Sequence, residues 1–315
     1  APRYVNTAIP HIPVTAHGLK ENGYATIATT NWLPYSWSIN NVAFAEVMHT
    51  ALSYFQAGRA DAGYKLLKSS VLDGMYLGDS PGNFGQISFY DAARGECYRD
   101  FGDPIGVASR VLIQGLFGIL PDALNQQIIL RPGFPDDWDK ASVSTPDINY
   151  RFTRKEDTDT YHITQRFQTP LHPVLHVNAR KEKIRSVKVN GVPATWQSIE
   201  SAHGYPLLSI QAEGTSSTTI TIEWEGAPLH TLAVQEPVIT SNGKLALQIP
   251  SGASISQVYD PQSVLANHTV EATAFNAQIK GEPGHHTFFV YTHQGEMDWW
   301  QPVNIYIENV RESPS

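Results

Sequence analysis

Hydrophobic positions along the chain recur at two different spacings, and the change falls near residue 134. Before it, apolar residues recur at steps of three and four, the spacing of one face of an α-helix. This spacing predicts helices over residues 41–57, about 60–78 and 103–118. Because only two residues separate the first two, we expect them to be antiparallel neighbours.

After residue 134 the pattern becomes one of alternating apolar and polar positions, rich in β-branched and aromatic residues. Asn190-Gly191 is the strongest hairpin signal, because both residues tolerate the positive φ of a tight turn. We predict strands over residues 161–167, 207–212, 218–224, 245–249, 286–291 and 303–307.

These patterns together predict an α+β multidomain protein, in which a partly helical region of about three helices precedes an antiparallel β-sandwich region. The helical region, with an extended N-terminal segment, is expected over residues 1–134. A β-sandwich follows over 135–235. Residues 236–315 form a second sandwich or a continuation of the first.

Composition and charge exclude several classes of function. The formal net charge of −8 argues against nucleic acid as a partner, because such surfaces need clustered Lys and Arg. The single cysteine, Cys97, cannot form an intramolecular disulfide, and no Cys/His cluster predicts a metal site. No apolar run is long enough to span a bilayer, and the N-terminus lacks the apolar core of a signal peptide. We expect no cofactor.

The long connection over residues 79–102 carries the densest set of candidate chemical groups. Its 24 residues separate the second and third predicted helices, and ordered loops of that length are usually functional. Carboxylates between arginines and aromatic rings suit a sugar site, in which acids protonate the leaving oxygen or activate water. A salt-bridged loop without such a role is the alternative. The groups concerned are Asp79, Asn83, Asp91, Arg94, Glu96, Arg99 and Asp100.

A second dense patch, residues 30–41, lies just ahead of the first predicted helix. Its aromatic rings and amides could form the wall of a pocket, and core packing is the alternative for the two tryptophans. The patch offers Trp32, Tyr35, Trp37, Asn40 and Asn41.

Several motifs, taken in order, give the chain a resemblance to a known group of enzymes. They are Trp37-Ser38-Ile39-Asn40-Asn41, Ala57-Gly58-Arg59, Pro81-Gly82-Asn83-Phe84-Gly85, Gly115-Leu116-Phe117-Gly118-Ile119, Pro121-Asp122 and Arg131-Pro132-Gly133-Phe134-Pro135 with Trp138. This series resembles the end of an (α/α)6-barrel glycoside hydrolase of the α-rhamnosidase-like and α-fucosidase-like bacterial kind. In that family the last barrel helices run into a C-terminal β-sandwich.

The resemblance implies hydrolysis of a glycosidic bond by two carboxylates, with the catalytic base on a loop shortly before the last barrel helix. Matched to this chain, it points to Glu96 first and then to Asp91 and Asp100. The implied sugar-binding residues are Trp32, Tyr35, Trp37, Asn41, Asn83, Arg94 and Arg99. It also implies a bacterial, periplasmic or extracellular setting.

Three predicted helices are far fewer than a complete barrel needs, so whether the chain is an enzyme stays open. We expect a fragment whose partner is the missing N-terminal part of the same polypeptide or a second copy. The leading hypothesis is therefore the C-terminal portion of a glycoside hydrolase that acts on a glycan. The alternative is a non-catalytic carbohydrate-binding or structural module.

The alternative makes its own prediction at Trp299-Trp300. Together with Phe288-Phe289 and Tyr291, this pair could form a sugar-stacking platform on the second β segment, although core packing is the favoured interpretation of such residues. Adjacent residues of a strand point to opposite faces, so one of the two tryptophans should face outward.

Overall fold

The structure is a computed structural model of the 315-residue chain, and it describes residues 13–14, 26–27, 44–72, 103–230 and 236–308. The chain divides into two compact units. The first comprises Ala1–Thr145 with Leu171–Pro173, and the second comprises Pro146–Pro170 with Val174–Ser315. Helices followed by mostly antiparallel sheets confirm the predicted α+β class.

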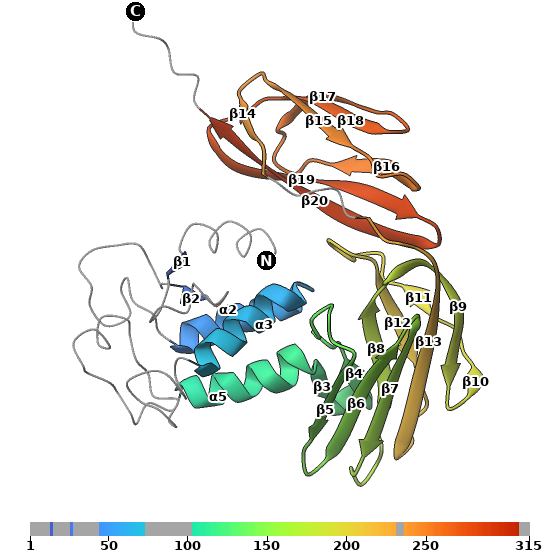
Figure 1. Ribbon diagram of the computed structural model, residues 1–315. Helices are drawn as coiled ribbons and strands as arrows, with labels where there is room; N and C mark the ends of the chain where they lie inside the picture. Colours follow the sequence, from blue (N-terminus) through green and yellow to red (C-terminus); the bar gives the residue numbers. More distant parts are fainter. Residues whose placement is uncertain (1–12, 15–25, 28–43, 73–102, 231–235, 309–315) are drawn as a thin grey trace, which may run out of the picture. The chain divides into compact units, whose positions relative to one another are not determined.

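Helices α2 (Phe44–Gln56) and α3 (Ala60–Val71) form an antiparallel pair in the first unit (Figure 1). The third predicted helix begins at Asp103 as expected but consists of two parts. Helix α5 (Asp103–Arg110) continues into the π-helical turn η3 (Val111–Leu116). All three predicted helices are therefore confirmed within the described residues.

The Phe55 ring on α2 sits among three glycines that come from distant parts of the sequence. A Cβ atom at Gly133 would lie 2.4 Å from this ring, and one at Gly115 would lie 2.7 Å from it. Gly63 of α3 is nearly as close, at 3.1 Å. Because carbon atoms in contact lie about 3.5 to 4.0 Å apart, larger residues at Gly115 and Gly133 would displace the ring.

The first unit also contains short strands. Strand β3 pairs with β4 in an antiparallel hairpin whose turn is the 3-10 helix η4, and β1 pairs with β2. Their bounds are β1 Pro13–Val14, β2 Thr26–Ile27, β3 Ile119–Asp122, η4 Ala123–Asn125, β4 Gln127–Leu130 and β5 Lys140–Ser144.

The second unit begins with a β-sandwich, here called the first sandwich. One of its sheets has the strand order β10-β9-β13-β7-β6, and the other has the order β11-β12-β8. Burial alternates along β7 and β13, so large apolar side chains fill the space between the sheets. The bounds are β6 Ile148–Lys155, β7 Thr158–Gln165, β8 His172–Asn178, β9 Lys181–Val189, β10 Val192–Pro193, β11 Gln197–Ser198, β12 Leu207–Gln211 and β13 Ser217–Pro228.

The predicted Asn190-Gly191 turn joins β9 to β10. Both residues have positive φ, 51° and 80°, and Val189 is paired with Val192 across the turn. The amide oxygen of Asn190 also accepts a hydrogen bond of 2.8 Å from the backbone N–H of Thr219 on β13.

A buried carboxylate stabilises one end of the first sandwich. Asp159, 1% exposed, accepts hydrogen bonds of 2.9 Å from both Arg154 and Arg180. Its second oxygen accepts the indole N–H of Trp224 at 3.1 Å. This charge is therefore fully paired, as a buried charge must be.

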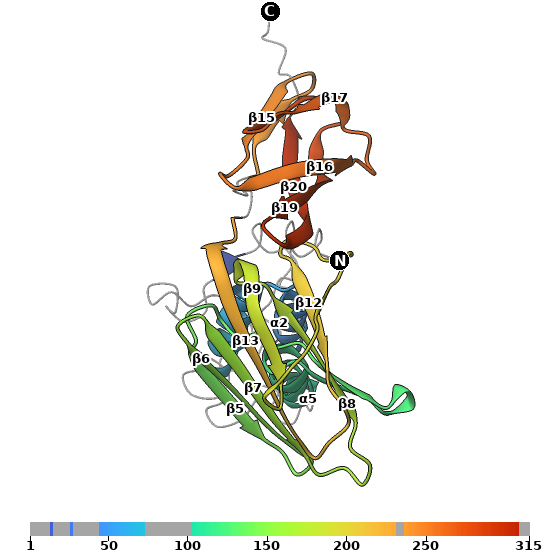
Figure 2. The ribbon, with the colours of Figure 1, turned by 90° about the vertical axis from the view of Figure 1, so that its right-hand side faces the viewer.

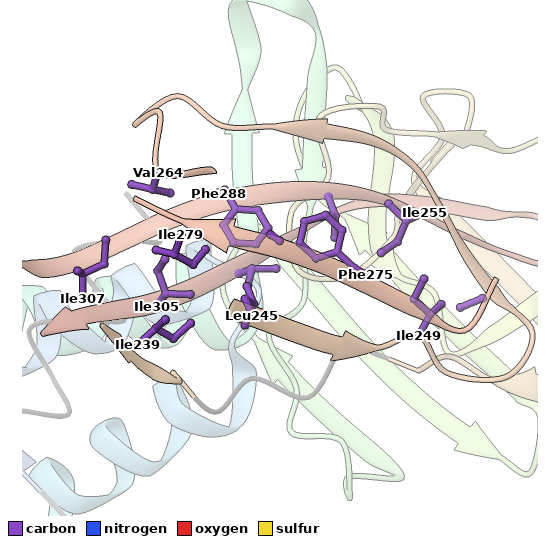
Figure 3. Close-up of a cluster of buried hydrophobic side chains, with 14 residues drawn as sticks. Ile239, Leu245, Ile249, Ile255, Val264, Phe275, Ile279, Phe288, Ile305 and Ile307 are labelled. Atoms are coloured by element: carbon purple, nitrogen blue, oxygen red, sulfur yellow. The ribbon is translucent and has the colours of Figure 1, made fainter. Parts of the chain in front are cut away.

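The second sandwich packs one sheet of order β14-β20-β19-β16 against another of order β15-β18-β17 (Figure 2). Fourteen buried apolar residues fill the layer between them, with the Phe275 and Phe288 rings 5.5 Å apart near the middle (Figure 3). The bounds are β14 Val238–Thr240, β15 Lys244–Gln248, β16 Ala253–Tyr259, β17 Leu265–Val270, β18 Ala274–Ile279, β19 Gly284–Gln294 and β20 Met297–Glu308.

The turn between β19 and β20 contacts strand β9 of the first sandwich. Glu296 donates its backbone N–H to the carbonyl oxygen of Glu182 at 2.7 Å. Gly295, at φ 63°, lies so close that a Cβ there would be 2.3 Å from the same oxygen. The Glu182 carboxylate accepts hydrogen bonds from the Ala227 N–H at 3.2 Å and from Gln294 at 3.4 Å. These bonds hold the pKa of Glu182 below its usual value, the Ala227 bond contributing most.

Candidate functional site

The ten residues that the resemblance implies as catalytic or sugar-binding lie outside the described residues, so their positions and roles stay predictions. They are Glu96, Asp91, Asp100, Trp32, Tyr35, Trp37, Asn41, Asn83, Arg94 and Arg99.

The motif at residues 131–138 lies within the described residues, and it packs within the first unit. The Phe134 ring meets Phe117 edge to face at 5.5 Å and stacks on Trp138 at 6.3 Å. Trp138 in turn meets Tyr64 of α3 at 4.9 Å. At Gly118, φ 64°, a Cβ would lie 1.8 Å from the Arg131 carbonyl oxygen. These contacts account for the motif as packing between the helices and the strands that follow.

Histidines and carboxylates do not gather into a metal site in the part of the chain that the structure describes, where no three such groups could hold one ion. His172 and His176 lie on β8. His285 is hydrogen-bonded to Glu236 at 2.7 Å, and His286 to the Glu282 carbonyl oxygen at 2.7 Å. Among the described helices, none is both long and apolar enough to cross a membrane.

The outward-facing side of the β16-β19-β20 sheet carries a row of aromatic side chains. Across these strands, Tyr259 is paired with Phe289, and Tyr291 with Trp300. We call these four residues the aromatic face. They alternate along their strands with buried residues of the opposite face, such as Phe288, Val290 and Trp299.

The rings of the aromatic face contact one another across the strands. Tyr291 and Trp300 have their ring centres 5.0 Å apart, and Tyr259 lies 6.2 Å from Phe289 and 6.4 Å from Trp300. Tyr259 is 57% exposed, and the other three rings are partly exposed. His203 meets the edge of Phe289 at 5.8 Å.

Trp300 is fixed in place through its backbone. Its N–H donates to the Ala202 carbonyl at 2.9 Å, and its carbonyl accepts from the Gly204 N–H at 2.8 Å. The 202–204 segment thus fixes the strand position of Trp300, which helps to preorganise the ring at the centre of the aromatic face.

Polar groups border the aromatic rings. His293 and Asp298, opposite each other on β19 and β20, share a hydrogen bond of 2.7 Å between Nδ1 and Oδ1. Gln257 of β16 is exposed and is paired with Tyr291 of β19. Partial burial raises the pKa of Tyr291, and the carboxylates of Asp298 and Glu200 raise it further.

The prediction for Trp299-Trp300 is confirmed, because Trp299 is 1% exposed and Trp300 is partly exposed on the other side of the sheet. Phe288 and Phe289 divide in the same way between core and face. Sequence reasoning missed Tyr259. Strict alternation from the buried Ala253 and Ile255 would place Tyr259 on the core side, and the irregularity of β16 between Ile255 and Gln257 turns it outward instead.

Comparison with known proteins yielded no matching family model and no matching curated protein. Among solved structures, an α-L-rhamnosidase from Dictyoglumus thermophilum aligns with 57% of this chain at 14% identity and a TM-score of 0.37. The chain spans only 21% of that enzyme.

Two further solved structures align at lower scores. The Bacteroides ovatus protein SGBP-B of a mixed-linkage glucan utilization locus, solved with a mixed-linkage heptasaccharide, aligns with 54% of this chain and 63% of its own at 8% identity and a TM-score of 0.21. Tandem Ig repeats of Dlar align with 49% of this chain and 90% of their own, at 10% identity and a TM-score of 0.20. At these TM-scores the likenesses carry no argument about function, which has to come from the aromatic face itself.

Proposed function

We propose that this chain binds carbohydrate through the aromatic face of its second sandwich, as the carbohydrate-binding portion of a carbohydrate-active protein. One observation carries the proposal. Four neighbouring aromatic side chains stand on the outward side of a sheet, in contact with one another and bordered by polar groups.

Such a surface matches both the apolar C–H face of a sugar ring and the hydroxyl groups around it. Aromatic rings offer flat apolar area to the C–H face of a pyranose at low cost in side-chain entropy. Gln257, His293 and Asp298 at the border supply donors and acceptors for the hydroxyl groups at the rim of the ring. A few placed polar groups beside apolar contacts are the usual composition of a ligand site.

The binding proposal is tested on the full chain with a panel of neutral polysaccharides in isothermal titration calorimetry. Tyr259→Ala and Trp300→Ala should each weaken binding about tenfold, because a lost ring contact of about 1.4 kcal/mol is worth that factor. Val270→Ala is the matched control, since Val270 is a 42% exposed apolar residue on β17 of the other sheet. Thermal unfolding of each variant checks its fold.

Wild-type chain that binds none of the polysaccharides, or that binds them equally well after both substitutions, would refute the proposal.

The glycoside hydrolase portion suggested by the sequence motifs is the second candidate. One observation favours it. Ile105 and Leu112, seven residues apart along α5 and η3, are 50% and 40% exposed, which suits a helix that packs on further structure. In this candidate Glu96, or else Asp91 or Asp100, supplies the catalytic base, and the predicted pocket residues bind the sugar.

Incubating the chain with the same polysaccharides and measuring the release of reducing ends, alongside the binding measurement, separates the two candidates. Hydrolysis that Glu96→Gln abolishes would support the second candidate. Binding without hydrolysis would leave the chain a binding module.

A further inference from the structure

Two carboxylates lie beside the aromatic face. Asp298 lies on its border, opposite His293. Glu200 precedes the 202–204 segment that hydrogen-bonds to Trp300. Partial burial and these two carboxylates together raise the pKa of Tyr291, in keeping with positions of both carboxylates beside the face.

Positive charge is scarce in this region of the sequence. Residues 186–310 contain no arginine and only three lysines. Lys188 lies 3.6 Å from Glu223 in the first sandwich. Lys244 lies on β15, and Lys280 directly follows β18, so both belong to the other sheet. Among the described residues, the strands of the aromatic face therefore bring no lysine or arginine to it.

Recognition of an acidic sugar needs groups of the opposite kind. Carboxylate and sulfate groups are bound by guanidinium or ammonium groups, which form short charge-assisted hydrogen bonds. On the aromatic face, an anionic ligand would meet two carboxylates instead. Neutral hydroxyl groups, in contrast, can donate hydrogen bonds to those carboxylates.

We infer that the aromatic face selects neutral glycans and rejects glycans that carry carboxylate or sulfate groups. Asp298 and Glu200 act as the determinants, as acceptors for sugar hydroxyls and as a repulsive element against anions. This inference rests on the proposed function, and it adds the class of ligand.

The test compares each neutral polysaccharide that binds with a chemically matched anionic form of itself. Galactomannan and mixed-linkage β-glucan are suitable probes, because oxidation of their primary alcohols gives uronate residues on an unchanged backbone. We expect the chain to bind the oxidised form at least about fivefold more weakly than the neutral form at low salt, and high salt should reduce this difference in affinity.

Variants locate the effect on the face. The double variant Asp298→Asn with Glu200→Gln should lower the ratio of the two dissociation constants, oxidised over neutral polymer, at least about fivefold. Glu271→Gln is the matched control, because it removes the same charge from an exposed residue between β17 and β18 on the other sheet. It should leave the ratio unchanged.

The outcomes separate the two proposals. If the oxidised polymer binds as tightly as the neutral one, or if Glu271→Gln changes the ratio as much as the double variant does, the inference on ligand class is wrong while sugar binding stands. If neither form binds, the proposed function fails, and the inference fails with it.

Discussion

The two β-sandwiches of the second unit carry different kinds of side chain on their solvent-facing sides. On the first, Thr219 is paired with His162, and Thr221 with Thr160 and Lys188, so the outward side is polar. On the second, the corresponding rows pair tyrosine with phenylalanine and tyrosine with tryptophan.

An antiparallel sheet with one solvated side needs only apolar residues inward and polar residues outward. The first sandwich follows that rule. The second sandwich departs from that rule on the outward side of its β16-β19-β20 sheet. Contiguous exposed apolar groups usually mark a binding surface. Under the proposed function, the difference separates a sheet shaped by stability alone from one shaped also by recognition.

The sharpest test of this comparison replaces two neighbouring residues of β20 by alanine, one at a time. Trp299→Ala should cost about 4 kcal/mol of unfolding free energy, because it removes a fully buried indole. Trp300→Ala should cost far less stability and instead weaken sugar binding. Chemical denaturation of both variants measures the contrast. Similar losses of stability at the two positions would show that Trp300 is part of the core.

The second largest effect is expected in the first sandwich at Asp159. Asp159→Ala should destabilise the fold by about 3 kcal/mol, because it leaves Arg154 and Arg180 without their shared carboxylate and frees the Trp224 N–H. Asp157→Ala is the control, since its 54% exposed carboxylate pairs with Lys181 at the surface and should matter much less. Sugar affinity of the folded Asp159 variant should equal that of wild type, as measured by calorimetry well below its unfolding temperature.

A smaller effect depends on pH and concerns the contact between the two sandwiches. The folded-state pKa of Glu182 is lowered, so its contribution to stability is present above the unfolded pKa near 4.5 and is lost as pH falls through the folded value. Glu182→Gln should therefore lower the unfolding temperature at neutral pH, and the gap to wild type should close in acid. Glu271→Gln should produce no such pattern. A gap that stays constant from neutral to acidic pH would contradict the assignment.

Much of the fold could be predicted from local rules. The three helices followed from apolar spacing, and the β9-β10 hairpin followed from Asn190-Gly191, because both depend on neighbours in sequence. The hairpin of β3 and β4 was not predicted. Its strands are only four residues each, and Pro121 interrupts the first of them.

The aromatic face could be predicted only in part. Alternation alone required that one of Trp299 and Trp300 face outward, but which one depends on the register of β19 and β20. Tyr259 joins the face through strand pairing between β16 and β19, a contact across 30 residues that no local pattern encodes. The roles of the glycines around Phe55 were equally hidden, because these close contacts arise from tertiary packing.

The two backbone hydrogen bonds of Trp300 also have a mechanical meaning. A polymer held by the Trp300 ring and pulled by its free end would load the bonds to Ala202 and Gly204 as well as the pairing of β20 with β19. Tension would then pass into the first sandwich through a segment distinct from the covalent link between β13 and β14. The second sandwich would thus share a pulling force with the first through two separate connections.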